Sequence, residues 1–176
     1  MFDRLVSMNC RSRNTLVRRL AGQLLEKLYG CEIRCDQMDR TVRFAHHARG
    51  CTIVAAKIFE NVVIFQNVTL GANLRFNKIS EEWENVGNPI VCAGVIVCDG
   101  AKVLGPIVIG ENSVVAAGAV ITKDVPADSI AYGFNQIRAK DARYDFVFAQ
   151  PMINAELIVQ ANNRSIEECE ESRARG

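Results

Sequence analysis

A repeat of six residues is the strongest pattern in the chain. Apolar residues recur at intervals of six, and a small or β-branched residue or a leucine stands four positions after each of them. A helix would repeat its apolar positions at three and four, and a strand at two. The first positions are Ile58, Ile64, Leu70, Val91, Val97, Val103, Ile109, Val115 and Ile121, and the second positions are Val62, Val68, Leu74, Val95, Ala101, Ile107, Ser113, Ala119 and Val125.

A period of six predicts short strands separated by tight turns. Glycine and asparagine, which tolerate a positive φ, stand where those turns belong. Three hexads would make one triangular coil, and each coil would bury its apolar edge only against its neighbours. The turn residues are Gly94, Gly100, Gly110, Gly118, Asn61, Asn67, Asn73 and Asn112.

The repeat predicts three parts of the chain. Residues 1–30 form an N-terminal helical segment, residues 31–135 the coil, and residues 136–176 a C-terminal extension. A polar and aromatic insertion over 72–89 interrupts the hexads and predicts a loop thrown outward, and the repeat ends after Pro126. The C-terminal extension is expected to be helical over residues 154–169.

Leucines at a spacing of four predict the N-terminal helix, and Gly30 is placed to end it. We expect this stripe to pack against the rest of the chain. Its four leucines at a spacing of four are Leu16, Leu20, Leu24 and Leu28, and Val17 and Leu25 widen it.

Composition narrows the class of protein. The 176 residues are 49% hydrophobic and carry a net charge of +1, so no overall field favours nucleic acid. No apolar run reaches the roughly 18 residues of a membrane span, and charges interrupt the first 28 residues, unlike a signal peptide. We therefore expect a cytoplasmic protein. The seven cysteines include no Cys-x-x-Cys pair, and with only two histidines we expect reduced thiols and no metal site.

Five motifs make the chain resemble the serine acetyltransferases, a branch of the hexapeptide-repeat acyltransferases. The resemblance implies a mainly β fold, a left-handed parallel β-helix, that transfers an acetyl group from acetyl-CoA to a hydroxyl group. It also implies a homotrimer with acetyl-CoA sites between subunits. The motifs are Tyr29-Gly-Cys-Glu-Ile33, His47-Ala-Arg-Gly50, Gln66-Asn-Val-Thr-Leu-Gly71, Gly100-Ala-Lys-Val-Leu-Gly105 and Ala117-Gly-Ala-Val-Ile-Thr-Lys-Asp-Val-Pro126.

The resemblance also implies catalytic residues. In the family a histidine acts as general base, and an upstream aspartate orients it, which suits a hydroxyl that must lose its proton as it attacks. The spacing from the acidic residue Glu32, together with the match to the His-Ala-x-Gly motif, places the base at His47, with Glu32 as its acidic partner. Counting back through the hexads from Gly71 places it at His46 instead. We favour His47 and keep His46 as a candidate.

Acetyl-CoA is expected to lie against small residues, because they allow the pantetheine arm to approach the backbone. Ala116, Ala117 and Gly118 are such small residues, and so is Gly100, which begins the motif Gly100–Gly105. Lys123 is placed to meet a phosphate of CoA.

The acceptor side departs from the family. The family has Arg-His-Pro where this chain has Gly87-Asn88-Pro89, so the cation for an amino-acid carboxylate is missing. Arg75 or Lys78 could replace it, and Trp83 with Asn88 is expected to face the acceptor. Serine, a sugar or capsular polysaccharide hydroxyl, and a non-catalytic trimeric binding protein are therefore competing hypotheses.

Overall fold

A computed structural model of the chain describes residues 1–85, 87–143, 160 and 164. Residues 1–146 and 147–176 form two compact units. The helix predicted over residues 154–169 lies outside the described residues, apart from Gln160 and Arg164, which are helical. Within the described part, no helix is long and apolar enough to span a membrane.

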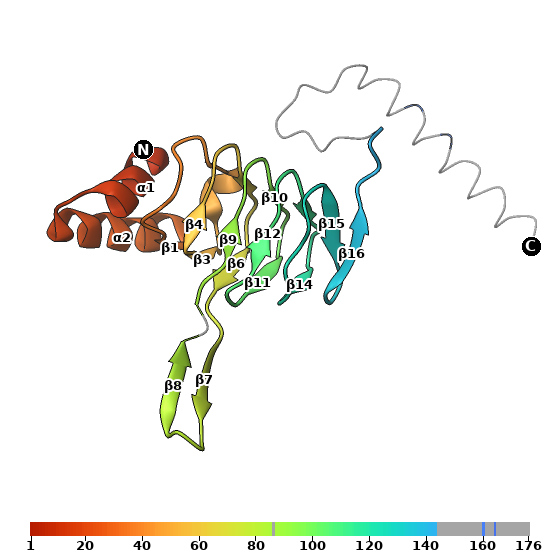
Figure 1. The fold of residues 1–176 in the computed structure, drawn as a ribbon. Helices are drawn as coiled ribbons and strands as arrows, with labels where there is room; N and C mark the ends of the chain where they lie inside the picture. Colours follow the sequence, from red (N-terminus) through yellow and green to blue (C-terminus); the bar gives the residue numbers. More distant parts are fainter. Residues whose placement is uncertain (86, 144–159, 161–163, 165–176) are drawn as a thin grey trace, which may run out of the picture. The chain divides into compact units, whose positions relative to one another are not determined.

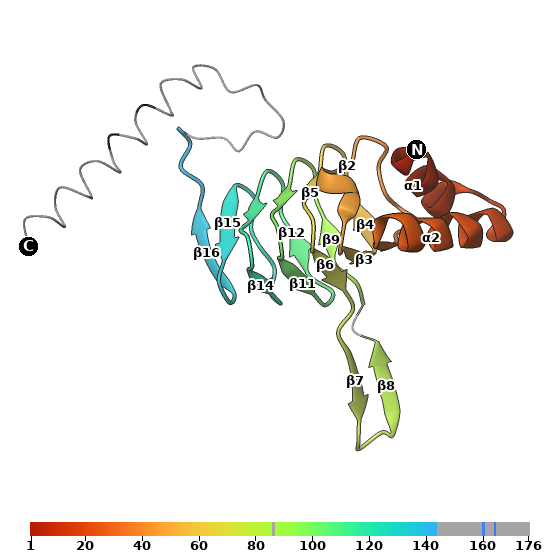
Figure 2. The same ribbon diagram turned by 180° about the vertical axis from the view of Figure 1, so that it is seen from behind.

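Short strands wind into a coil with three faces (Figures 1 and 2), and strands from successive turns pair in parallel. Face 1 contains β2 (Arg43–Phe44), β5 (Val63–Ile64), β10 (Ile96–Val97), β13 (Val114–Val115), β15 (Ser129–Tyr132) and β16 (Gln136–Ala139). Face 2 contains β1 (Glu32–Arg34), β3 (Thr52–Val54), β6 (Thr69–Gly71), β11 (Lys102–Leu104) and β14 (Val120–Ile121). Face 3 contains β4 (Lys57–Ile58), β9 (Ile90–Val91) and β12 (Val108–Ile109).

The nine first positions of the hexads form an inner ladder from Ile58 to Ile121. Every member is at most 1% exposed, because it points inward and is covered by the same position of adjacent coils. The second positions are buried as well, with one exception: Leu74 is 59% exposed. The prediction for Leu74 is wrong because the chain leaves the coil after Gly71.

The coil runs further than the hexads predict. The hexads end at Pro126, yet β15 still pairs in parallel with β13, within the range 31–135 predicted for the coil. The chain then turns back, and β16 pairs antiparallel with β15. Residues 136–139, expected to begin the C-terminal extension, therefore belong to face 1.

Two helices precede the coil: α1 (Phe2–Arg11) and α2 (Thr15–Tyr29). Asn14 caps α2 by accepting hydrogen bonds from two backbone N–H groups, and Gly30 ends it with φ +64°, as predicted.

The expectation that the leucine stripe packs against the rest of the chain is wrong for its four leucines at a spacing of four and holds for Leu25. Its members Leu16, Leu20, Leu24 and Leu28 are 44–62% exposed. The helix α2 instead buries Ala21 together with Leu25, one of the two residues expected to widen the stripe. Ala21 is small enough to allow the close packing of α2 against α1 and β1.

The insertion over 72–89 is a β-hairpin of β7 (Leu74–Asn77) and β8 (Glu82–Asn85). It leaves the coil between face 2 and face 3 and projects away from it in both views (Figures 1 and 2).

Candidate active site

Both histidines lie in the turn between β2 and β3, where the chain passes from face 1 to face 2. This turn is longer than its equivalents. Thr52 follows Phe44 by eight positions, whereas the paired residue Thr69 follows Ile64 by five. Three extra residues therefore make the histidine turn bulge from the edge of the coil. We call the edge between face 1 and face 2 the histidine corner.

The backbone of this turn is strained. His46, His47 and Ala48 all have a positive φ, at 51°, 55° and 55°. A residue other than glycine loses roughly 1–2 kcal/mol in this left-handed backbone conformation. Such strain clusters at functional sites. Ala48 is fully buried and holds the turn to the coil, while both imidazoles remain exposed.

The two imidazoles differ in their surroundings. The ring of His47 lies 5.5 Å from the rings of Phe2 and Tyr29, measured between centroids. Phe2 and Tyr29 also contact each other edge-on at 5.0 Å. No ring contact of His46 is recorded within the described residues. Aromatic packing therefore distinguishes His47 from His46.

Glu32 lies on β1, at the N-terminal end of face 2, with its side chain directed outward because Ile33 points into the coil. Its carboxylate pairs with the guanidinium of Arg34 at 2.8 Å. Within the described residues, Glu32 forms no hydrogen bond with His46 or His47. The role of Glu32 as the acidic partner therefore stays a prediction.

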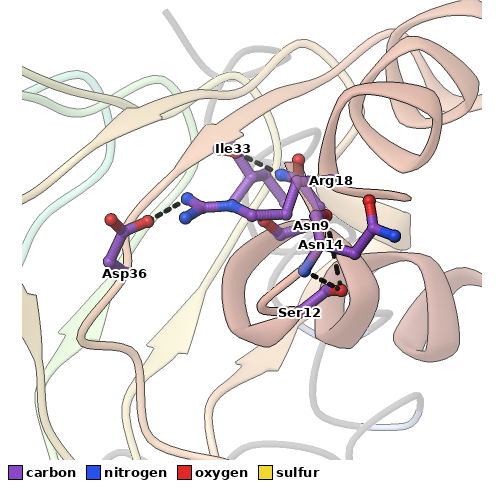
Figure 3. Close-up of polar contacts among 6 residues, drawn as sticks. All are labelled: Asn9, Ser12, Asn14, Arg18, Ile33 and Asp36. Carbon is purple, nitrogen blue, oxygen red and sulfur yellow. Dashed lines mark hydrogen bonds and ion pairs between the residues drawn. The ribbon is translucent and has the colours of Figure 1, made fainter. Parts of the chain in front are cut away.

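Polar contacts dock the helices onto the first coil beside this turn. Figure 3 shows Asn9 of α1 reaching the backbone of Ile33 on β1, where its side chain donates to the carbonyl. The guanidinium of Arg18 donates to the carbonyl of Asn9 at 3.0 Å and pairs with Asp36. A cavity of about 430 Å³ lies between α1, α2 and β1, and Glu32 is among the residues that line it.

Cys31 and Cys51 flank the histidine turn, so a thiolate nucleophile beside a histidine has to be considered. Both side chains are buried. Burial raises the pKa of Cys31 to about 11 and also raises the pKa of Cys51. The Sγ of Cys51 is 3.1 Å from the carbonyl oxygen of Phe65. These thiols are neutral packing groups and do not fit covalent catalysis.

The small residues predicted for acetyl-CoA lie on the same histidine corner. The N–H of Asn67 donates to the carbonyl of Arg49, that of Gly100 to Gln66, and that of Gly118 to Asp99. These turns therefore stack in a column along the edge, from the histidine turn through Asn67 and Gly100 to Gly118. At about 4.8 Å per coil, its three steps span roughly 14 Å. Ala116, Ala117 and Gly118 form the turn at its far end.

Gly118 leaves this edge open. Its φ is +67°, and a Cβ placed on it would meet no atom within 4 Å. A ligand could therefore approach the backbone closely here, as the predicted acetyl-CoA site requires.

Lys123 lies elsewhere. It follows β14 and stands on the next edge, between face 2 and face 3, roughly 15 Å from Gly118 at about 3.3 Å per residue. The hairpin leaves the coil at this edge, which we call the hairpin corner. Within one chain, Lys123 is therefore separated from the histidine corner by the width of face 2.

The hairpin residues predicted to bind the acetyl acceptor lie on its two opposite faces. Arg75 is opposite Glu84 and pairs with it, while Phe76 is opposite Trp83 with ring centroids 5.3 Å apart. Hydrogen bonds from Asn77 and Arg75 lower the pKa of Glu84. Because neighbouring residues of a strand point to opposite faces, Arg75 and Trp83 face in opposite directions.

Two buried polar atoms lack a partner within the described residues: Oδ1 of Asn88 and Oε1 of Gln66. Asn88 lies at the base of the hairpin, and Gln66 precedes Asn67 on the histidine corner. Buried acceptors without a donor are uncommon, so each of these oxygens calls for a partner such as an ordered water or a ligand. Gln66 belongs to the motif Gln66–Gly71, but the sequence indicates no role for its side chain. It also gives no indication that Phe2 and Tyr29 contact His47.

Comparison with known proteins places this arrangement in a family. The serine acetyltransferase of Helicobacter pylori strain 26695 is 31% identical over 124 residues, which are 70% of this chain and 68% of that protein. The serine acetyltransferase of Mycobacterium tuberculosis is 34% identical over 119 residues, which are 67% of this chain and 49% of that protein. The chain belongs to the serine acetyltransferase family, and the predicted resemblance is confirmed.

The structure of a Brucella abortus serine acetyltransferase in complex with coenzyme A superposes with a TM-score of 0.54. It is 26% identical, and the match covers 70% of this chain and 49% of that protein. No model of a known protein family matches the chain. The chain spans 37% of a Schizosaccharomyces pombe relative and about half of several bacterial relatives.

Proposed function

We propose that the chain is an acetyl-CoA-dependent O-acetyltransferase that acts on a small hydroxyl acceptor, and that its coil is left-handed. One observation carries the proposal: the histidine turn and the open glycine turn at Gly118 lie on the same edge of the coil, in a member of the serine acetyltransferase family. A base at one end of a groove and a thioester bound along it are what acyl transfer requires.

His47 is the proposed base. Its imidazole takes the proton of the acceptor hydroxyl while the oxygen bonds to the acetyl carbonyl carbon. The bond between that carbon and the CoA sulfur breaks, and the proton passes to the departing sulfur. Glu32 is the proposed acidic partner that stabilises the imidazolium. In this structure its carboxylate pairs with Arg34, so the role requires Glu32 to turn toward the histidine.

Acetyl-CoA is proposed to lie along the histidine corner against Gly100, Ala116, Ala117 and Gly118. The open space at Gly118 admits a ligand to the backbone, whose N–H and C=O groups can bond the amides of pantetheine. The coenzyme A complex of the Brucella abortus relative supports this co-substrate. No metal takes part in the proposed reaction.

A homotrimer would explain why Lys123, Asn88 and the hairpin lie on a different corner from the histidines. A cyclic assembly joins two different surfaces at every interface. The hairpin corner of one subunit can then complete the histidine corner of the next. Lys123 would meet a CoA phosphate there, and the unpartnered oxygen of Asn88 could accept a hydrogen bond from the acceptor.

The acceptor is proposed to be serine or a sugar. Family membership favours serine. The exposed pair of Phe76 and Trp83 favours a sugar or capsular polysaccharide, because aromatic faces suit the C–H surface of a sugar ring. Of the two cations that could bind a serine carboxylate, Arg75 is paired with Glu84, which leaves Lys78.

The test is release of CoA thiol from acetyl-CoA across serine, homoserine and a panel of sugars. His47→Ala should lower turnover about 10²–10⁴-fold and leave CoA binding nearly unchanged. His46→Ala, its matched control, should have a smaller effect; the reverse ranking would make His46 the base. A parent protein that binds CoA but acetylates no acceptor would favour a non-catalytic binding protein.

A further inference from the structure

We propose that Phe2 and Tyr29 are positioning residues that set the orientation of the His47 imidazole; this rests on the proposed role of His47 as base. The three rings form a closed cluster, with His47 centroids 5.5 Å from each of the other two. The interplanar angle is 71° with Phe2 and 40° with Tyr29. Such edge-on and tilted arrangements are the favourable geometries for aromatic rings.

Packing is what orients this imidazole. Within the described residues, no side-chain hydrogen bond is recorded for His46 or His47, whereas the backbone of the turn is bonded, as from the N–H of Arg49 to the carbonyl of His46. The His47 side chain is exposed on its other side. An exposed side chain without a hydrogen bond would otherwise sample several rotamers.

The two rings are themselves held firmly. Phe2 is 4% exposed, and the far end of α1 is pinned by Arg11, which donates to the carbonyls of Met38 and Asp39 at 3.1 and 2.9 Å. Asn9, in the last turn of the same helix, adds a hydrogen bond to the first coil, as Figure 3 shows. Helix α1 is thereby fixed to the coil and cannot easily move Phe2 away from the turn.

Tyr29 is linked to the histidine turn through the backbone. It is the last residue of α2, and the carbonyl of the next residue, Gly30, accepts a hydrogen bond from the N–H of Gly50 at 3.0 Å. Gly50 closes the turn that carries His47. The N-terminal helices therefore support the base as well as covering the end of the coil.

This support matters because the histidine turn bulges from the coil and is strained. A general base must bring its nitrogen within hydrogen-bond reach of the acceptor, and a misplacement of about 1 Å can cost on the order of 10²-fold in rate. We expect loss of either ring to lower kcat with little change in the KM for acetyl-CoA, whose proposed binding residues lie further along the edge.

The experiment compares kcat and KM for Tyr29→Leu, Tyr29→Phe and Phe2→Leu with the parent. Tyr29→Leu and Phe2→Leu should lower kcat roughly 10–100-fold, whereas Tyr29→Phe keeps the ring and should keep most of the activity. Phe44→Leu is the matched control, because Phe44 contacts Phe2 at 5.9 Å, and no ring contact between it and His47 is recorded in the described part. Denaturation curves show whether each variant is folded.

NMR of the imidazole protons gives a second readout that does not depend on activity. The chain has two histidines, so one variant, His46→Gln, assigns both sets of signals. Tyr29→Leu should shift the His47 signals, leave those of His46 in place, and be reversed by Tyr29→Phe.

Unchanged His47 signals in folded Tyr29→Leu would overturn the proposal, as would shifted signals with an unchanged kcat. A parent without any thiol release overturns the proposed function instead and takes the catalytic role of the rings with it. In that case the signals still report whether the rings hold the imidazole.

Discussion

Two regular apolar repeats run through the molecule, the inner ladder of the coil and the leucine stripe of α2. Their residues are of the same kind, yet the ladder is at most 1% exposed and the four leucines at a spacing of four in the stripe are 44–62% exposed. The ladder is buried by copies of itself, because each coil covers the inner positions of the next. A single helix has no such copy and buries only the side that meets a neighbour.

The difference teaches that a period identifies an element but does not identify its buried side. In α2, Ala21 and Leu25 are also four residues apart, and they face the rest of the chain. Leu24 and Leu25, adjacent in sequence, therefore have opposite environments: 44% and 0% exposed.

The largest effect is expected from a charge in the inner ladder. Ile109→Asp removes a fully buried side chain and leaves an unpaired carboxylate between stacked coils. The expected loss is about 5 kcal/mol or more, comparable with the whole stability of a typical domain. Loss of the folded circular dichroism signal would show it, and a well-folded variant would contradict the stacked interior.

The next effect concerns thiols at the N-terminal end of the coil. Burial raises the pKa of Cys31 and Cys35 from 9.0 to about 11 in the folded chain. The unfolded chain therefore loses these protons first, so their stabilisation is complete below pH 9 and is lost as the pH rises toward 11. We expect the free energy of unfolding to decline by a few kcal/mol over this range, because each tenfold change in proton affinity corresponds to about 1.4 kcal/mol.

Urea unfolding between pH 8 and 11 measures this decline. A Cys31→Ala, Cys35→Ala variant is less stable at pH 8 but should decline less steeply, because other titrating groups are shared with the parent. Equal slopes for the two proteins would mean that these thiols ionise as readily in the folded chain as in the unfolded one.

The coil and the helices also differ in how much space surrounds a glycine. A Cβ on Gly110 would lie 2.6 Å from the carbonyl carbon of Pro126 and 2.8 Å from the Cα of Ala127. A Cβ on Gly22 of α2 would meet only the side chain of Asn9, at 3.0 Å. Backbone cannot yield as a side chain can, so Gly110→Ala should lower stability by roughly 1–3 kcal/mol.

Gly22→Ala is the matched control. It should be nearly neutral, because alanine favours a helix by about 1 kcal/mol over glycine, which offsets the adjustment of Asn9. Thermal unfolding of both variants measures the contrast. Equal losses at the two glycines would show that the corners of the coil are no more tightly stacked than the contact between the helices.

The sequence predicts the parts of the molecule in which the repeat packs against itself. The inner ladder, the inserted segment and the end of α2 at Gly30 follow from spacing and turn residues. The side of α2 that is buried, the exposure of Leu74 and the final strand after Pro126 depend on neighbours that are distant in sequence. Phe2 reaches His47 because α1 docks on the first coil, and nothing in the local pattern around Phe2 indicates that contact.

The smallest effect is expected on the leucine stripe itself. Leu20→Gln with Leu24→Gln keeps two good helix formers and changes exposed side chains, so the free energy of unfolding should change by less than about 1 kcal/mol. Leu25→Gln, one residue away and fully buried, should instead cost about 2–5 kcal/mol. Urea unfolding at two protein concentrations compares them. A loss in the double variant of 2 kcal/mol or more that grows with protein concentration would mean that a second copy covers the stripe, and the contrast between stripe and ladder would then hold only for the isolated chain.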